Sequence, residues 1–363
     1  MPTLFPSFPA HSLRRYLGLL SVLLLGISAS AMAQAPAKGR VVVTYLDSEL
    51  LKGNPGGENP QRRVSVYLPA GYEANAAKRY PVLYYLHGFT WSDSLLFHAD
   101  GLGELLDQAI ADGKIRPVIV VAPNEQTLFQ GSFYTNSATN GPWADFTAKE
   151  LVSFIDKNYR TLAKPASRGL AGHSMGGNGT LRLAMLYPGT YAAAYALSPG
   201  FAAPHPEWMS ARPSQDAASR AKSRAAIQSD FNAIRLVACA RAFSPTPGKG
   251  AFGAALPRSF GPDSLAHRDA VLAQWGAASP VALLPKHLAS LRQLRGLAFD
   301  WGEQDQFQHI PPACRTLDMQ LSAYGIPHAA ESYEGNHGNR IMGRDGRLYQ
   351  KLLPFFNQRL QFD

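Results

Sequence analysis

The sequence predicts an α/β fold, in which a mostly parallel sheet carries helices on both faces. Short, continuous apolar segments at 82–86, 118–121 and 191–197 are typical of strands that are buried on both sides. Helix-forming stretches near 101–112 and 145–159 lie between them. This alternation indicates a parallel sheet, because neighbouring parallel strands need a crossover connection.

Size and composition agree with one large domain. The chain has 363 residues, of which 46% are hydrophobic and 17% charged, so it can bury a sizeable core. Its formal net charge is +9, but the basic residues are scattered, without a Lys/Arg run or a nucleic-acid-binding motif. We therefore expect a solvated surface and no nucleic-acid partner.

The first element is a candidate signal peptide at residues 1–33. Two arginines precede the apolar segment 16–27, and the small-residue motif Ala-Met-Ala at 31–33 offers a cleavage site. The apolar segment is too short to cross a bilayer as a helix, which takes about 20 residues. We expect cleavage to leave a mature domain at 34–363, periplasmic or secreted, with no stable membrane span.

The mature sequence begins with an antiparallel strand pair. Two alternating apolar segments, 41–46 and 64–68, are separated by a turn-rich stretch at 53–60. In the parallel part that follows, a short strand at 170–171 precedes a helix over 176–187.

The alternation stops between about residues 202 and 290. We interpret this stretch as a cap inserted between the sixth and seventh strands, with a basic helix over 217–236. The core pattern then resumes as strand, helix, strand and terminal helix at 294–300, 312–324, 329–333 and 348–360.

Two cysteines, Cys239 and Cys314, leave two alternatives open. In an oxidising compartment they could join the insertion to the helix after the seventh strand, or they could stay as two buried thiols. Neither has metal-ligand spacing, and the chain contains no CxxC or HExxH motif. We expect no metal site and no cofactor.

Residues 172–177 read Gly-His-Ser-Met-Gly-Gly and lie between a predicted strand and a predicted helix. A serine between glycines in this context is typical of the nucleophile elbow of an α/β-hydrolase. Small neighbours let the strand and the helix approach closely, and the strained turn presents the serine at the edge of the sheet. Ser174 is therefore the candidate nucleophile of a predicted α/β-hydrolase fold.

A serine nucleophile needs a histidine base and a carboxylate that orients it. In this fold they follow in the order Ser, acid, His, at the carboxyl ends of the parallel strands. Asp305 meets both conditions, in the turn beyond the seventh strand. Asp300 is the alternative, but it ends the apolar run, where we expect it to point into the sheet edge or cap a turn.

His337 follows the last predicted strand and is the candidate base. His328 begins that strand, and roughly six residues at about 3.3 Å each would place it ~20 Å away, at the wrong end of the sheet. His173 adjoins the nucleophile, but successive strand residues face opposite ways, so we expect its ring to pack beneath the elbow.

Two backbone donors are candidates for an oxyanion hole. In an α/β-hydrolase one donor is the N–H after the nucleophile, here that of Met175. The other comes from the loop after the third strand, where Gly88 permits the N–H of Phe89 to turn inward.

Several aromatic residues lie in loops that should border the cleft. For any one of them alone, packing in the core or at the rim is the better interpretation. Together they indicate an aromatic-lined acyl or aryl pocket. The residues are Trp91, Phe129, Phe133, Tyr134 and Trp143, of which we expect Trp91, Phe133, Tyr134 and Trp143 to bind substrate.

Six short motifs occur in order from the third strand to the last. They are YYLHG at 84–88, GSFY at 131–134, GHSMGG at 172–177, ALSPG at 196–200, GEQD at 302–305 and GNH at 335–337. In these motifs the chain resembles the putative-esterase family of α/β-hydrolases, which includes feruloyl and acetyl-xylan esterases, S-formylglutathione hydrolase and secreted mycolyltransferases. The resemblance implies ester hydrolysis with Ser174, Asp305 and His337 as a triad and Phe89 and Met175 as oxyanion donors. The insertion looks longer than in compact members of the family.

The sequence thus predicts an exported serine carboxylesterase that forms an acyl-enzyme. Its expected substrates are small-molecule or polysaccharide-linked esters, including esters with an aromatic or carbohydrate-linked acyl group. One alternative is an acyltransferase that uses the same triad with a sugar or alcohol acceptor. Another is a non-catalytic carbohydrate-binding relative. The intact Ser, Asp and His argue against the last, and the oligomeric state stays open.

Overall fold

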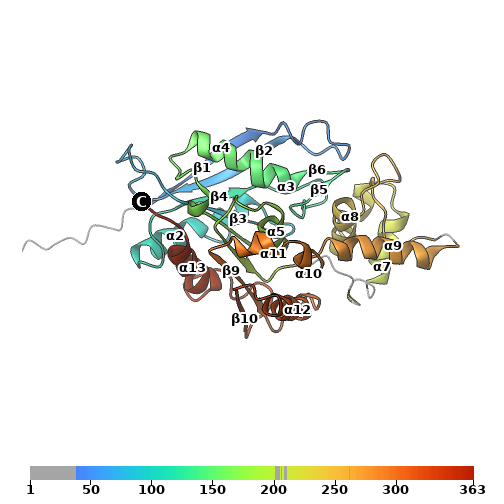
Figure 1. The fold of residues 1–363 in the computed structure, drawn as a ribbon. Helices are drawn as coiled ribbons and strands as arrows, with labels where there is room; N and C mark the ends of the chain where they lie inside the picture. Colours follow the sequence, from blue (N-terminus) through green and yellow to red (C-terminus); the bar gives the residue numbers. More distant parts are fainter. Residues whose placement is uncertain (1–37, 201–204, 206, 208–210, 261) are drawn as a thin grey trace, which may run out of the picture. The chain divides into compact units, whose positions relative to one another are not determined.

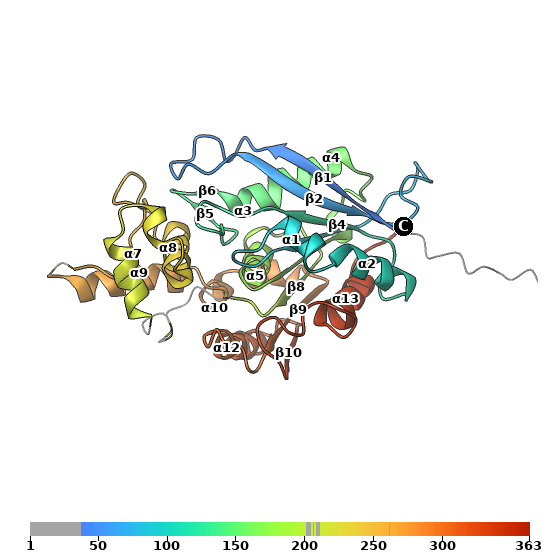
Figure 2. The same cartoon turned by 180° about the vertical axis from the view of Figure 1, so that it is seen from behind.

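A mostly parallel sheet of eight strands has the order β1-β2-β4-β3-β7-β8-β9-β10 (Figures 1 and 2). Strand β2 is antiparallel to β1 and to β4, and all other neighbours are parallel. The predicted α/β fold is confirmed. The strands are β1 Arg40–Asp47, β2 Gln61–Leu68, β3 Val82–Leu86, β4 Ile119–Pro123, β7 Arg168–His173, β8 Ala193–Leu197, β9 Gly296–Gly302 and β10 Ala329–Tyr333.

The computed structural model describes residues 38–200, 205, 207, 211–260 and 262–363. The expected signal peptide at 1–33 lies outside these residues. Residues Lys38–Asp363 cluster as one unit. Within the described part of the chain, no helix is long and apolar enough to cross a membrane.

The central strands β3, β4 and β8 are buried on both faces, as their continuous apolar sequences predict. In β3, Leu83 and Tyr85 pack toward α2 and α13, whereas Tyr84 packs toward α4 on the other face (Figures 1 and 2). The core helices and helical turns are α1 Asp93–His98, α2 Leu102–Ala111, α3 Trp143–Asp145, η1 Phe146–Glu150, α4 Leu151–Asn158, η2 Pro165–Ser167, α5 Met175–Leu186, α12 Ile310–Ala323, η5 Leu348–Leu352 and α13 Leu353–Arg359.

The predicted insertion corresponds to the chain between β8 and β9. Three of its helices, α7, α8 and α9, lie side by side next to the hairpin of β5 (Asn136–Ser137) and β6 (Gly141–Pro142) (Figures 1 and 2). The described helical elements of the insertion are α7 Arg212–Arg220, η3 Arg224–Ile227, α8 Phe231–Phe243, α9 Ser264–Ala277, α10 Pro280–Leu283, η4 Leu284–Lys286 and α11 Leu288–Arg292.

The predicted continuous helix over 217–236 is wrong. Helix α7 ends at Arg220, because Ala221 adopts an extended conformation. Helix α8 then starts afresh, capped by the side chain of Asp230, which accepts a hydrogen bond of 3.0 Å from the backbone N–H of Ala233. A cap of this kind stabilises a new helix start.

A buried arginine fixes α8 to the core. The guanidinium of Arg241 donates to Glu58 at 3.0 Å, to Asn140 at 2.8 Å and to the carbonyl of Phe252 at 2.9 Å. Both members of the Arg241 and Glu58 pair are buried. Losing one partner would leave the other charge buried and uncompensated, so this contact strongly constrains where α8 lies.

The structure distinguishes between the two alternatives for the cysteines. Cys239 in α8 and Cys314 in α12 are both free and buried. Burial raises the pKa of the Cys239 thiol to about 12. Both residues therefore act as small apolar side chains of the core.

Candidate active site

The turn between β7 and α5 holds Ser174 in a strained conformation, with φ 58° and ψ −116°. Its N–H donates to the carbonyl of Leu197 at 2.9 Å. A Cβ atom on Gly176 would lie 2.0 Å from the carbonyl oxygen of Leu86, and one on Gly172 would lie 2.5 Å from that of Gly176. Strand, turn and helix approach so closely that neither position can hold a side chain.

Asp305 and His337 come together from the loops that follow β9 and β10. The ring Nδ1 of His337 lies 2.7 Å from Oδ2 of Asp305, and the carboxylate is wholly buried. The other carboxylate oxygen accepts the N–H of Phe307 at 2.8 Å. The side-chain carbonyl of Gln306 accepts the N–H of His337 at 3.3 Å. Hydrogen bonds to His337 and Phe307 therefore fix the orientation of the Asp305 carboxylate, and the bond from His337 to Gln306 joins the two loops.

Asp300 belongs to a different buried network. Its Oδ2 accepts hydrogen bonds of 2.8 Å from the hydroxyl of Tyr195 and from Nε of Arg347. Arg347 also donates to Glu331 at 2.7 Å. Asp300, within strand β9, thus compensates a buried arginine and has a structural role.

His328 lies apart from Ser174, as its position at the start of β10 predicts. Its Nε2 is 2.8 Å from Asp318, and its Nδ1 is 2.7 Å from the carbonyl of Ile326. Its ring stacks on that of Phe299 at an interplanar angle of 5°. These contacts occupy both ring nitrogens away from the nucleophile.

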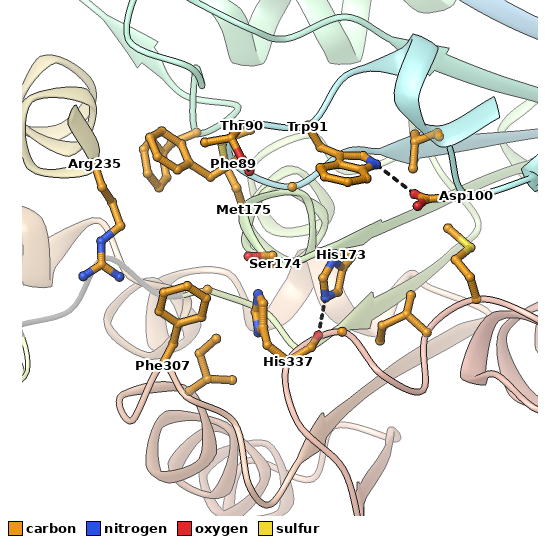
Figure 3. A pocket seen from close by; sticks show the side chains of 18 of the residues that line it. Phe89, Thr90, Trp91, Asp100, His173, Ser174, Met175, Arg235, Phe307 and His337 are labelled. Carbon is orange, nitrogen blue, oxygen red and sulfur yellow. Dashed lines mark hydrogen bonds between the residues drawn. The ribbon is translucent and has the colours of Figure 1, made fainter. Parts of the chain in front are cut away.

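His173 makes a contact that sequence reasoning did not find. Its Nε2 lies 2.7 Å from the backbone carbonyl of His337, and the two rings are 4.7 Å apart (Figure 3). Burial lowers the pKa of His173 to about 3, so its ring is neutral and donates this bond through Nε2–H. The expected packing beneath the elbow therefore includes a bond to the loop that carries the candidate base.

A cavity of about 410 Å³ is lined by both Ser174 and His337. Figure 3 shows these two side chains between two different walls. Phe89, Phe307 and Arg235 lie on one side, and Trp91 and Asp100 on the other (Figure 3).

The first wall is aromatic. Phe133 stacks on Phe89 with centroids 5.9 Å apart, and Phe231 meets Phe89 edge-on at 5.8 Å. The guanidinium of Arg235 lies 5.2 Å from the ring centroid of Phe307. Phe231 and Arg235 belong to α8, so the insertion contributes directly to the pocket.

An ion-pair network adjoins this aromatic wall. Glu207 lies 3.4 Å from Arg235 and 2.7 Å from Nδ1 of His309. Burial opposes ionisation of Glu207, but the hydrogen bond from His309 and the charge of Arg235 hold its pKa at about 2. The arginine charge is therefore largely neutralised by a carboxylate.

The predicted oxyanion donors lie where the elbow meets the loop after β3. Phe89 and Met175 both line the cavity beside Ser174 (Figure 3). A Cβ atom on Gly88 would lie 3.5 Å from the Cβ of Ser174, so this loop runs directly against the nucleophile.

Two of the four predicted substrate-binding aromatics line the cavity, namely Trp91 and Phe133. The predictions for Tyr134 and Trp143 are wrong, because both side chains are wholly buried and lie outside the lining. The hydroxyl of Tyr134 donates to the carbonyl of His87 at 2.9 Å. Phe133 and Tyr134 have φ values of 53° and 50°, and this turn directs Tyr134 into the core.

Phe129 is also buried, and it packs on Phe252 of the insertion. Trp143 donates its indole N–H to the carbonyl of Asn140 at 2.9 Å.

Within the part of the chain that the structure describes, no group of His, Cys, Asp and Glu side chains is arranged to hold a metal ion.

Known proteins resemble this chain in both sequence and structure. A family profile described as putative esterase matches residues 58–341. An endo-1,4-beta-xylanase/feruloyl esterase of Xylanibacter ruminicola is 37% identical over 135 residues, which are 34% of this chain and 18% of that protein. An esterase of Mycobacterium tuberculosis is 36% identical over 143 residues, which are 38% of this chain and 28% of that protein. The chain therefore spans less than a third of the length of these curated relatives.

Solved structures share the fold over most of the chain. A ferulic acid esterase superposes with a TM-score of 0.61 and 21% identity, covering 89% of this chain and 100% of the other. An S-formylglutathione hydrolase from Agrobacterium tumefaciens gives a TM-score of 0.57 at 16% identity, covering 89% and 96%. The architecture is thus that of α/β-hydrolase esterases.

The buried pair of Asp300 and Arg347 yields a prediction about stability. Asp300→Asn should lower the free energy of unfolding by about 3 kcal/mol, because it leaves the arginine partly uncompensated. Urea denaturation followed by circular dichroism measures this. Glu331→Gln is the matched control, since Glu331 is half-exposed and its loss should cost about 1 kcal/mol or less. Equal stability of the two variants would contradict the assigned role of Asp300.

Proposed function

The chain belongs to the putative esterase family, and from this membership we propose that it hydrolyses carboxylic esters with Ser174 as nucleophile. One observation carries the proposal. His337, whose ring is bonded to the buried Asp305, lines the same cavity as a serine held on a strained strand-to-helix turn. This is the arrangement that activates a serine hydroxyl.

In the proposed mechanism, Nε2 of His337 accepts the hydroxyl proton as Oγ of Ser174 attacks the ester carbonyl. Asp305 keeps the proton on Nδ1 and stabilises the imidazolium. The N–H groups of Phe89 and Met175 bind the oxyanion. His337 then protonates the departing alcohol, and a water molecule, deprotonated by the same ring, releases the acid from the acyl-enzyme.

We also propose that the aromatic wall accepts the acyl group. Four phenylalanine rings line that side of the cavity, and apolar burial favours an aromatic or medium-length acyl group over acetate. The feruloyl esterase activity in the names of a curated relative and of a solved structure supports this class of substrate.

Export to the periplasm or the medium is the third part of the proposal. It rests on the arginines, the apolar segment and the Ala-Met-Ala motif within residues 1–33.

Replacing the nucleophile tests the mechanism. Ser174→Ala should lower kcat for an aryl ester by about 10⁴-fold or more, leaving only the assistance of binding and of the oxyanion hole. His337→Ala should do the same. His328→Ala is the control and should retain activity, because both nitrogens of that ring bond elsewhere. Undiminished hydrolysis by purified Ser174→Ala would remove this residue from the mechanism.

Acyl specificity tests the aromatic wall. With one common alcohol, kcat/KM should be about ten- to two-hundredfold higher for benzoyl or feruloyl esters than for the acetyl ester. Phe133→Ala should reduce that ratio, because it removes a ring from the wall. A profile that is flat, or that peaks at acetyl, would contradict the acyl assignment and leave the nucleophile untouched.

The export proposal predicts a mature N-terminus at or near Gln34, after the small residues of the cleavage motif. Intact-mass spectrometry of the protein from its native host measures this. A mass that includes residues 1–33 would contradict cleavage.

A further inference from the structure

The wall opposite the phenylalanines contains a fixed carboxylate. The indole N–H of Trp91 donates to Oδ2 of Asp100 at 2.8 Å (Figure 3). The backbone N–H of Trp91 donates to the carbonyl of Gly88 at 3.1 Å, and that of Asp100 donates to the carbonyl of Leu95 at 3.0 Å. Trp91 is thereby anchored to the loop after β3, and Asp100 to α1.

One oxygen of this carboxylate has no hydrogen-bond partner among the described residues. Among the described residues, no lysine, arginine or histidine forms an ion pair with Asp100, and its Oδ1 accepts no hydrogen bond. Asp100 lines the cavity and its side chain is only partly buried, so Oδ1 is accessible to a ligand. Oδ1 of Asp100 is therefore a hydrogen-bond acceptor that no described residue uses.

The surroundings of Asp100 are apolar. Trp91 and Leu96 belong to the hydrophobic cluster on this face of the sheet, together with Ile341 and Met342 of the loop after β10. Partial burial raises the pKa of Asp100 above its usual value. In such surroundings a hydrogen bond is strong and an unpaired negative charge repels another.

The two walls therefore differ in what they can recognise. On the aromatic side, the carboxylate of Glu207 already compensates Arg235 and bonds to His309. On the other side, the carboxylate faces the cavity with only the indole as partner. A hydroxyl group of a ligand can donate a hydrogen bond to the free oxygen of this carboxylate. An apolar group at the same place removes water from the carboxylate without replacing the lost hydrogen bond, and an anionic group is repelled by its charge.

We propose that Asp100 is a specificity-determining residue that selects, on the Trp91 side of Ser174, an uncharged alcohol moiety bearing a free hydroxyl group. This inference rests on the proposed esterase activity and extends it to the alcohol half of the substrate. The free hydroxyl donates to Oδ1 of Asp100, the indole N–H holds Oδ2, and the scissile ester lies over Ser174.

The test compares four benzoate esters that differ only in the alcohol: ethyl, 2-hydroxyethyl, choline and glycolate. For the wild-type chain, kcat/KM should be about ten- to a hundredfold higher for the hydroxyethyl than for the ethyl ester, the range expected of a hydrogen bond to a charged group. The glycolate ester, which carries a carboxylate, should be the poorest substrate.

Asp100→Asn should reduce the ratio of hydroxyethyl to ethyl ester toward one. Its amide oxygen can still accept the indole N–H, while the group facing the cavity becomes a donor. Glu104→Gln is the matched control, because it removes an exposed carboxylate of α2 outside the cavity lining and should keep the wild-type ratio. Trp91→Phe should also lower the ratio, because it releases Oδ2.

The possible outcomes are distinct. A hydroxyethyl preference that is lost in Asp100→Asn supports the proposal. A ratio near one in the wild-type chain, or one that Asp100→Asn leaves intact, overturns it while the esterase assignment stands. A dominant preference for the choline ester that Asp100→Asn abolishes also overturns it, since the carboxylate would then select cations. Hydrolysis of none of the four esters would instead contradict the proposed function.

Discussion

The close approach of β7 and α5 at Ser174 is the constraint on which the rest of the site depends. The carbonyl of Leu86 from β3 and that of Leu197 from β8 flank the turn, so three adjacent strands determine its position. A side chain at Gly176 would force one of them to move. The serine can keep an unfavourable backbone conformation because this packing leaves it no alternative.

Much of the site could be predicted because strand direction determines which loops meet. Because β7, β8, β9 and β10 are parallel, they end at the same edge of the sheet, and the chain order of Ser174, Asp305 and His337 predicts that these residues meet there. The structure shows the bond of His337 to Asp305 and a cavity that Ser174 and His337 both line. Asp300 was separated from Asp305 by the same reasoning, since a residue inside a buried strand meets its neighbours in the sheet.

Side-chain direction in irregular segments could not be predicted. Gln130, Phe133 and Tyr134 have positive φ values, and none of them is a glycine or an asparagine that would signal the reversal. Trp143, at the start of α3, is buried by packing that the local sequence does not show. Phe231 and Arg235 line the cavity from α8, whose position is constrained by contacts such as the bond of Arg241 to Glu58, 183 residues away in the sequence. Such contacts depend on tertiary packing that local patterns do not encode, although Asp230 could have marked the start of α8.

The bond from His173 ends on the main chain of His337 and not on its ring. Any amino acid at position 337 presents the same carbonyl, so the anchor of this loop is independent of the chemistry that the loop carries. A neutral donor also adds no charge beside the imidazole that we propose gains and loses a proton. The bond that holds the loop is therefore separate from the side chain proposed as the base, and the side chain at 337 can be exchanged without removing that bond.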